Sequence, residues 1–245
     1  MSAGRTLATA ERVLRQLRHD RRTLALVFLV PPFLLTLFRY VFDGQPETFD
    51  RVGGPLVGIF PFTSMFLVTS IAMLRERTSG TLERLMSMPI AKGDLLGGYG
   101  LAFAAVAAVQ ASITSAVAFG LLGLDTAGPI WAVVVIAVGN ALLGMALGLF
   151  LSAFATTEFQ AVQFMPAVVI PQILLCGLLV PRDQMAPPLE WLSNLLPLTY
   201  AYDALQQVTA SGETDADVWF DVGIVAGCIV LALALGSATL RRRTP

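Results

Sequence analysis

The clearest chemical pattern in the sequence is a short charged segment between two apolar runs. It reads Glu76-Arg77-Thr78-Ser79-Gly80-Thr81-Leu82-Glu83-Arg84-Leu85-Met86-Ser87-Met88-Pro89. Gly80 allows a sharp backbone turn, Thr81 is a suitable N-cap, and Glu83 suits the first turn of a helix because the helix dipole favours acids there. Pro89 ends the pattern. The segment therefore predicts a short helix over about 77–88.

This predicted helix has an apolar stripe between charged flanks. Leu82, Leu85 and Met86 share one face at i, i+3 and i+4. A helix of this kind suits docking into a groove on another protein. The alternative is a helix that rests on the membrane surface.

A second segment near the C-terminal third combines aromatic residues with prolines. Leucines at 189, 192, 195 and 196 share one helical face before Pro197 breaks the run. Trp191, Tyr200 and Tyr202 have side chains that suit a membrane–water interface. Neither piece is long enough to cross a bilayer. We predict two short re-entrant or interfacial helices over about 187–209.

The residue sets of several membrane chemistries are missing from the sequence. It has no G-x-x-x-x-G-K-[ST] phosphate loop, so the chain is not predicted to hydrolyse ATP itself. Cys176 and Cys228 lie in apolar runs and His19 is the only histidine, which excludes a disulfide framework and a histidine metal site. No ionisable residue lies near the middle of an apolar run, which disfavours an ion-coupled carrier. Uphill transport would take its energy from a partner.

The composition requires a membrane to position these segments. Hydrophobic residues make up 56% of the chain, charged residues 13%, and the mean hydropathy is +0.72, well beyond soluble domains. Six apolar runs are long enough to cross a bilayer. They cover about Leu24–Phe42, Pro55–Leu74, Leu95–Leu122, Ile130–Leu151, Ala161–Val180 and Trp219–Leu240. The fold class predicted is an all-α integral membrane protein with six transmembrane helices.

The basic residues orient these spans. Arginine and lysine concentrate before the first span, between the second and third, and after the sixth, at positions 5, 12, 15, 18, 21, 22, 75, 77, 84, 92 and 241–243. The other side has only Arg39, Arg51 and Arg182. Because cytoplasmic loops carry the excess of basic residues, both termini are predicted to be cytoplasmic. Arg39, near the outer end of its span, is expected to snorkel to the interface.

Two further patterns concern packing. Leu7, Ala10, Leu14 and Leu17 repeat at helical spacing among arginines, which predicts an amphipathic helix on the cytoplasmic membrane surface within 1–23. It could be a simple anchor or a lever to a cytoplasmic partner. In the fourth span Gly144 and Gly148 form a small-xxx-small pair, which favours close helix packing within the chain.

Taken together, these residues resemble the ABC-2 type membrane subunits of ABC transporters, and the daunorubicin-resistance-like permeases in particular. The stretch from Glu76 to Pro89 matches that family's E-x-x-x-G-T-L-E-x-L…P signature, and Leu196-Pro197-Leu198-Thr199-Tyr200 with Asp203-Ala204-Leu205 matches its L-P-L-T-Y…D-A-L. The chain departs from the family at Cys176-Gly177 and at Gln206. The resemblance covers the whole chain and implies one transmembrane domain over 1–245.

The resemblance also implies an exporter mechanism. Two permease subunits, identical copies or paralogues, would form a pathway above two separate ATPase subunits that bind ATP and Mg²⁺. The complex would lie among the lipids of the inner (cytoplasmic) membrane of a bacterium and would not bind nucleic acid. The ATPase-coupling residues would be Glu76, Arg77, Gly80, Thr81, Leu82, Glu83, Arg84, Leu85 and Pro89, with a second contact at Ala153–Gln160. Residues 1–23 would be the connecting helix. The outer gate would contain Trp191, Pro197, Tyr200, Tyr202 and Asp203.

The substrate is predicted from the polar residues inside the spans. Thr63, Ser64, Thr69, Gln163 and Gln172 are the candidates for the pathway, although each could instead serve hydrogen bonding between helices. The path is otherwise apolar and has no charge cluster to bind an anion. Amphipathic drugs or lipid-like molecules are therefore expected. The alternatives are export of a polysaccharide or glycolipid, and an energy-independent scaffold or immunity component.

Overall fold

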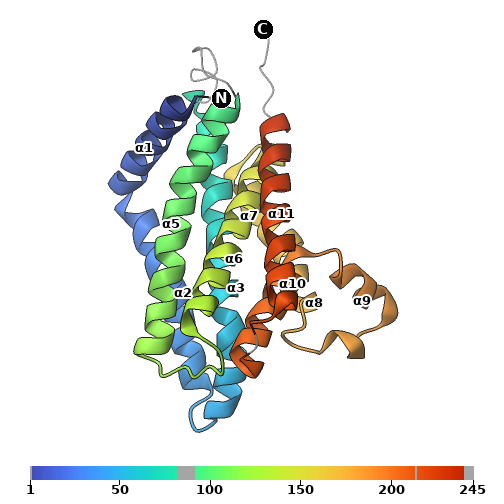
Figure 1. The fold of residues 1–245 in the computed structure, drawn as a ribbon. Helices are drawn as coiled ribbons and strands as arrows, with labels where there is room; N and C mark the ends of the chain where they lie inside the picture. Colours follow the sequence, from blue (N-terminus) through green and yellow to red (C-terminus); the bar gives the residue numbers. More distant parts are fainter. Residues whose placement is uncertain (1, 82–91, 213, 240–245) are drawn as a thin grey trace.

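The computed structural model describes residues 2–81, 92–212 and 214–239, and these ranges contain helices and no strands. The elements are α1 (Ala3–His19), α2 (Arg21–Val41), α3 (Pro46–Thr78), α5 (Lys92–Gly120), α6 (Ile130–Leu151), η1 (Ser152–Phe154), α7 (Glu158–Phe164), η2 (Met165–Val169), α8 (Ile170–Leu175), η3 (Arg182–Gln184), α9 (Pro187–Ser193), α10 (Pro197–Gln206), η4 (Gln207–Ser211) and α11 (Ala216–Thr239). The long helices run side by side as a bundle (Figure 1).

The bundle has two ends of different kinds. The N-terminus, Gly80 at the end of α3 and Thr239 at the end of α11 lie together at one end, called here the terminal end (Figure 1). The connections 42–45 and 121–129 lie at the opposite end. The chain therefore alternates in direction, as the six predicted crossings require.

Within the described ranges, six segments are long and apolar enough to cross a membrane. The fourth span has the predicted bounds Ile130–Leu151, and the second is longer than predicted because α3 continues at both ends to cover Pro46–Thr78. The fifth span ends earlier than expected, at Leu175. Residues 176–180 are apolar but not helical, since Gly177 has a positive φ of 105° that no right-handed helix contains.

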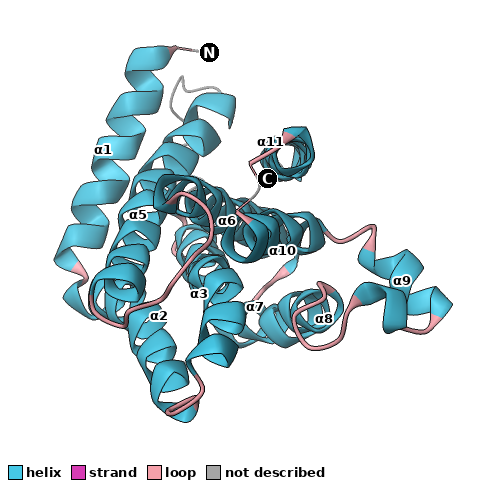
Figure 2. Cartoon of the chain, turned by 60° about the horizontal axis from the view of Figure 1, so that its bottom comes forward, coloured by secondary structure: helices cyan, strands magenta, loops and turns pink. Residues whose placement is uncertain are grey.

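The centre of the bundle is the packing of α3 against α6, as Figure 2 shows end-on. A Cβ atom on Gly144 would lie 2.1 Å from the Phe62 carbonyl oxygen, and one on Gly148 would lie 2.2 Å from Thr69 Oγ1. Ser70 Oγ donates to the Gly148 carbonyl at 3.1 Å. The two glycines therefore let the two helices approach closely enough for the Ser70 hydroxyl to bond across the contact, which confirms the predicted packing role of the pair.

The amphipathic N-terminal helix is present as α1. Its buried residues are Thr9, Ala10 and Val13, while Leu7 is 61% exposed. Gly98 on α5 allows the contact with Thr9, because a Cβ there would lie 2.4 Å from Thr9 Cβ. The helix therefore lies against α5, with Leu17 packed on the core and Leu7 facing outward.

The two short helices predicted over 187–209 are present as α9 and α10, and they differ in burial. α10 packs into the bundle through Leu198, Ala201, Ala204 and Leu205, which are at most 1% exposed. α9 stands away from the bundle in both views (Figures 1 and 2), and its Trp191 is 66% exposed. The peripheral spans also leave much apolar surface uncovered, since only 17% of the apolar window of α11 is buried against 61% for α6.

Candidate functional site

The signature segment begins at the terminal end of α3. Glu76 and Arg77 lie in its last turn, Ser79 caps the helix, and Gly80 follows with a φ of 72°. This φ supplies the sharp turn expected of the glycine. Thr81 is described and its hydroxyl lies 2.9 Å from that of Ser79. The remaining predicted coupling residues, Leu82, Glu83, Arg84, Leu85 and Pro89, lie outside the described residues, as does the helix that Thr81 is predicted to cap.

Glu76 joins three helices at this end. Its side chain is buried, with 5% of the residue exposed, and Oε1 lies 3.7 Å from Arg12 Nη1 on α1. Arg12 also donates from Nη2 to the hydroxyl of Tyr99 on α5, which is 1% exposed. Glu76 Oε2 and Arg12 Nε have no hydrogen-bond partner among the described residues. A change at Glu76 therefore acts on α1 and α5 as well as on the signature segment.

Arg75 makes a second link, on the solvent side. It donates from Nε to Glu158 Oε1 at 2.8 Å and from Nη2 to Glu158 Oε2 at 3.1 Å. Glu158 starts α7, directly after the connection 152–157. Both side chains are more than half exposed, so the pair adds at most about 1 kcal/mol to stability. Its effect is to join the start of the signature segment to the predicted second contact at 153–160.

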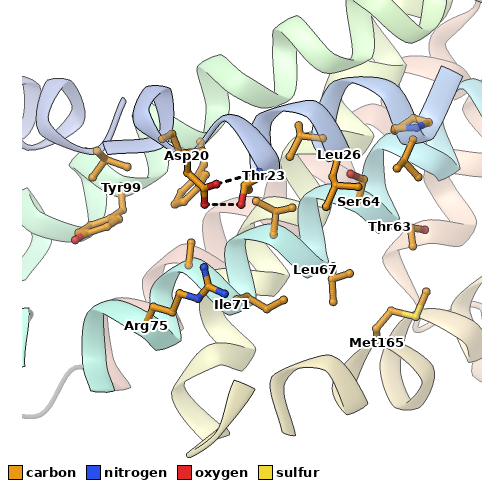
Figure 3. A pocket seen from close by; sticks show the side chains of 18 of the residues that line it. Asp20, Thr23, Leu26, Thr63, Ser64, Leu67, Ile71, Arg75, Tyr99 and Met165 are labelled. Carbon is orange, nitrogen blue, oxygen red and sulfur yellow. Dashed lines mark hydrogen bonds between the residues drawn. The ribbon is translucent and has the colours of Figure 1, made fainter. Parts of the chain in front are cut away.

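A cavity of about 580 Å³ lies between α2 and α3. Thr63 and Ser64, two of the predicted pathway residues, line it (Figure 3). Most of its wall is apolar, and Met165 of η2 contributes to it. The groups at its terminal end, called here the polar end, are Asp20, Thr23, Arg75 and Glu76.

Asp20 is both the N-cap of α2 and part of this polar end. It accepts from Thr23 N at 3.1 Å and from Thr23 Oγ1 at 2.6 Å, as Figure 3 shows. These hydrogen bonds from Thr23 are the main cause that lowers the Asp20 pKa below its usual value. The cavity therefore contains an ionised carboxylate at the mouth of an apolar space.

The other predicted pathway residues do not line this cavity. Thr69 is fully buried and donates to the Met65 and Met145 carbonyls, at 2.7 and 3.2 Å. Gln172 is 2% exposed and donates to the Val168 carbonyl at 3.1 Å. These two serve packing between and within helices. Gln163 is exposed on α7.

The predicted gate residues lie around α10. Pro197 is its first residue, and Tyr200 donates from its hydroxyl to the Asn194 carbonyl at 2.7 Å. Asp203 accepts from Arg182 Nη2 at 2.5 Å, and Tyr202 lies against Gly177, where a Cβ would be 3.0 Å from its ring. Burial raises the pKa of Asp203 to about 6 and that of Tyr202 to about 12. Trp191 lies apart from this cluster, on the exposed α9.

Sequence reasoning missed several partners in these clusters. Arg12 and Arg182 were used only to orient the spans and Asp20 was not singled out, yet they contact Glu76, Asp203 and Thr23 respectively. For Asp20 a signal was available, because an acid just before an apolar helix is a strong N-cap. Arg39, which was expected to snorkel, also has a partner that the sequence did not indicate, since its Nε donates to the Leu122 carbonyl at 3.3 Å.

These features define an α-helical, multi-pass membrane protein with its charged contacts at the helix ends. The family model for the ABC-2 type transporter matches residues 5–209. The chain belongs to the ABC-2 type transporter family.

Individual relatives are distant. The chain is 26% identical over 166 residues to the probable multidrug ABC transporter permease YbhR of Escherichia coli, which covers 67% of the chain and 45% of the relative. It is 25% identical over 196 residues to the linearmycin resistance permease protein LnrN of Bacillus subtilis, covering 80% and 50%. It is 24% identical over 204 residues to ABC transporter G family member 20 of Dictyostelium discoideum, covering 82% and 28%. The chain thus spans half or less of each of these relatives.

Proposed function

We propose that the chain is the permease subunit of an ATP-driven exporter of amphipathic drugs or lipid-like molecules. The observation that carries the proposal is the cavity between α2 and α3. Its wall is mostly apolar and includes Thr63 and Ser64, and its polar end contains Arg75 and Glu76, where the signature segment begins. A substrate in this cavity would touch the element that an ATPase moves. The names of two relatives, a probable multidrug permease and a linearmycin resistance permease, fit this substrate class.

The proposed coupling uses separate ATPase subunits, which bind ATP and Mg²⁺. They dock on the segment from Glu76 to Pro89, with a second contact at 153–160. The Arg75–Glu158 pair supports joint movement of the two contacts, and the Arg12–Glu76 pair carries the movement to α1. ATP binding would then close the ATPases, shift these elements and change access to the cavity from one side to the other.

The proposal also includes a second permease, as an identical copy or a paralogue. The exposed apolar surfaces of α2, of the α7–α8 span and of α11 are available to lipid or to this partner. Both termini are proposed to be cytoplasmic, in the inner membrane of a bacterium. Substrate would leave at the opposite end, past the gate formed by Trp191, Pro197, Tyr200, Tyr202 and Asp203.

The substitution Glu83→Lys tests this assignment. It reverses a charge in the first turn of the predicted coupling helix, where a base opposes the helix dipole, and it leaves the apolar spans unchanged. We expect it to abolish export and to weaken co-purification of the ATPase at least tenfold. Membrane insertion, measured as the yield of detergent-extracted protein, should stay normal.

Glu190→Lys is the matched control, because it makes the same charge change on the exposed helix α9 at the other end. It should leave ATPase co-purification unchanged. The coupling assignment is wrong if Glu83→Lys still binds the ATPase and exports like the unaltered chain. A chain that exports without any ATPase would overturn the exporter proposal itself.

A further inference from the structure

The polar end of the cavity has one basic group, and that group already has its partners. Arg75 is the one basic side chain among the described residues that line the cavity. Its guanidinium donates two hydrogen bonds to Glu158, from Nε and Nη2. This bidentate geometry is the strong form of an arginine–carboxylate pair. The charge of Arg75 is therefore balanced by Glu158, outside the cavity's acidic groups.

The acidic groups at the polar end have unused acceptor capacity. Glu76 is 95% buried, since 5% of the residue is exposed, and its Oε2 has no hydrogen-bond partner among the described residues. Its Oε1 lies 3.7 Å from Arg12, beyond hydrogen-bonding distance. Asp20 accepts from Thr23 N and Thr23 Oγ1, with a smaller contribution from the backbone N–H of Arg22, whereas a carboxylate has about four acceptor sites. A buried carboxylate oxygen without a donor is costly, so a ligand that donates hydrogen bonds would be favoured here.

We infer that the cavity binds a cationic amphipath, an apolar molecule with a protonated amine. Its ammonium group donates to Glu76 Oε2 and to the Asp20 carboxylate, and its apolar body lies along Leu26, Leu34 and Leu67 between α2 and α3. The inference rests on the proposed function, because it names the substrate class for the same path. Glu76 then contacts the ligand as well as Arg12 and Tyr99, at the start of the signature segment.

The dimensions of the cavity fit such a molecule. Its lining on α3 extends from Phe60 to Glu76, which is about 24 Å of helix axis at 1.5 Å per residue. That length is most of the hydrocarbon thickness of a bilayer, about 30 Å. Leu26 lines the cavity and is 62% exposed, so the cavity reaches the surface of α2. An amphipath can enter from the membrane with its charged group at the terminal end.

Binding to the full-length chain in phosphatidylcholine nanodiscs tests the inference. The probes are dodecylamine, dodecanoate and 1-dodecanol, which share a chain length and differ in charge, and empty nanodiscs correct for partition into lipid. We expect saturable binding of dodecylamine, at least tenfold tighter than of either other probe. Calorimetric titration at pH 7 measures the three affinities.

Two substitutions locate the site. Asp20→Asn removes the charge but keeps an N-cap that accepts from Thr23, and Glu76→Gln removes the other charge at constant size. Each should weaken dodecylamine binding about tenfold and leave 1-dodecanol binding within twofold. Asp43→Asn, an exposed acid in the connection 42–45, should bind dodecylamine like the unaltered chain.

Equal affinity for dodecylamine and dodecanoate would overturn the inference, as would unchanged dodecylamine binding in Asp20→Asn. If Glu76→Gln does not fold, Asp20→Asn still decides, because the asparagine Oδ1 still accepts the capping bond from Thr23 N. No ATPase takes part in these titrations. A failure here therefore leaves the exporter proposal standing, and a failure of the Glu83→Lys test leaves amine binding standing.

Discussion

Asp203 is a half-buried acid whose charge state depends on its surroundings at the opposite end of the bundle. Burial raises its pKa to about 6, against the attraction of Arg182, which lowers it. At neutral pH the carboxylate is therefore mostly ionised and paired with Arg182. The pair links the segment that leads into α9 to the helix α10. Acidification through pH 6 should protonate Asp203 and weaken this link.

The same pKa shift predicts how stability depends on pH. Because the folded-state pKa lies above the unfolded value of 3.8, the fold favours the protonated form. The contribution of Asp203 to the free energy of unfolding is thus largest below about pH 4 and is lost as the pH rises through 6. After discounting for partial exposure we expect a loss of about 1–2 kcal/mol.

Thermal unfolding in detergent at pH 4.5 and 7.5 measures this effect. The Tm of the unaltered chain, relative to that of Asp203→Asn, should be lower at pH 7.5 than at pH 4.5, because asparagine does not titrate. Asp183→Asn, an exposed acid of η3 next to Arg182, is the matched control. A difference that does not change with pH would contradict the assignment.

Some of this residue-level chemistry could be predicted from the sequence and some could not. The turn at Gly80 was predictable, because its cause lies within four neighbouring residues. The contact of Arg12 with Tyr99 joins residues 87 positions apart, and the ion pair of Arg182 with Asp203 joins residues 21 apart. Local spacing says nothing about such pairs, since they form only when separate helices pack together.

At the scale of elements, the contact between α3 and α6 decides the position of the cavity wall. The structure predicts that Gly144→Ala is destabilising, because the added Cβ would meet the Phe62 carbonyl at 2.1 Å and the helices would have to separate. Forcing an atom into a packed contact typically costs about 1–3 kcal/mol. We expect a lower Tm and a lower yield of folded protein in detergent.

Gly139→Ala on the same helix is the control for that substitution. A Cβ at Gly139 meets nothing within 4 Å, and alanine is the better helix former by up to about 1 kcal/mol. Its Tm should be equal to or above that of the unaltered chain. Equal stability of the two alanine variants would mean that α3 and α6 are not as close as described.

The bounds of the helices also show what the hydropathy pattern can predict and what it cannot. Ile130–Leu151 was predicted to the residue, because it is uniformly apolar and turn residues flank it. The fifth span was drawn too long, since hydropathy does not distinguish a helix from the apolar connection at 176–180. The amphipathic character of α1 was predicted, but its contact with α5 through Thr9 and Gly98 was not. Contact with a glycine on another helix has no signal within the segment.

At the scale of the whole molecule, the two ends of the bundle differ in their charged and aromatic residues. Arg12, Arg75 and Arg77 lie in helices at the terminal end, where Gly80 also lies. At the opposite end Trp131 of α6 stacks on Trp219 of α11, with ring centroids 6.2 Å apart, and both are exposed. Tryptophan pairs of this kind suit a membrane interface. The molecule therefore has one basic end and one aromatic end, separated by an apolar band.

This asymmetry predicts that the terminal end faces the cytoplasm. Single cysteines test it in a chain with Cys176→Ala and Cys228→Ala, using a maleimide that does not cross membranes. Asp43→Cys, exposed in the connection 42–45, should react in right-side-out vesicles, and Ser79→Cys, exposed at the end of α3, should react only in inside-out vesicles. The reverse pattern would invert the orientation, and with it the assignment of the polar end to the cytoplasmic leaflet. Reaction of both cysteines from one side would contradict the alternating directions of the helices, because α3 would then have both ends on one side of the membrane.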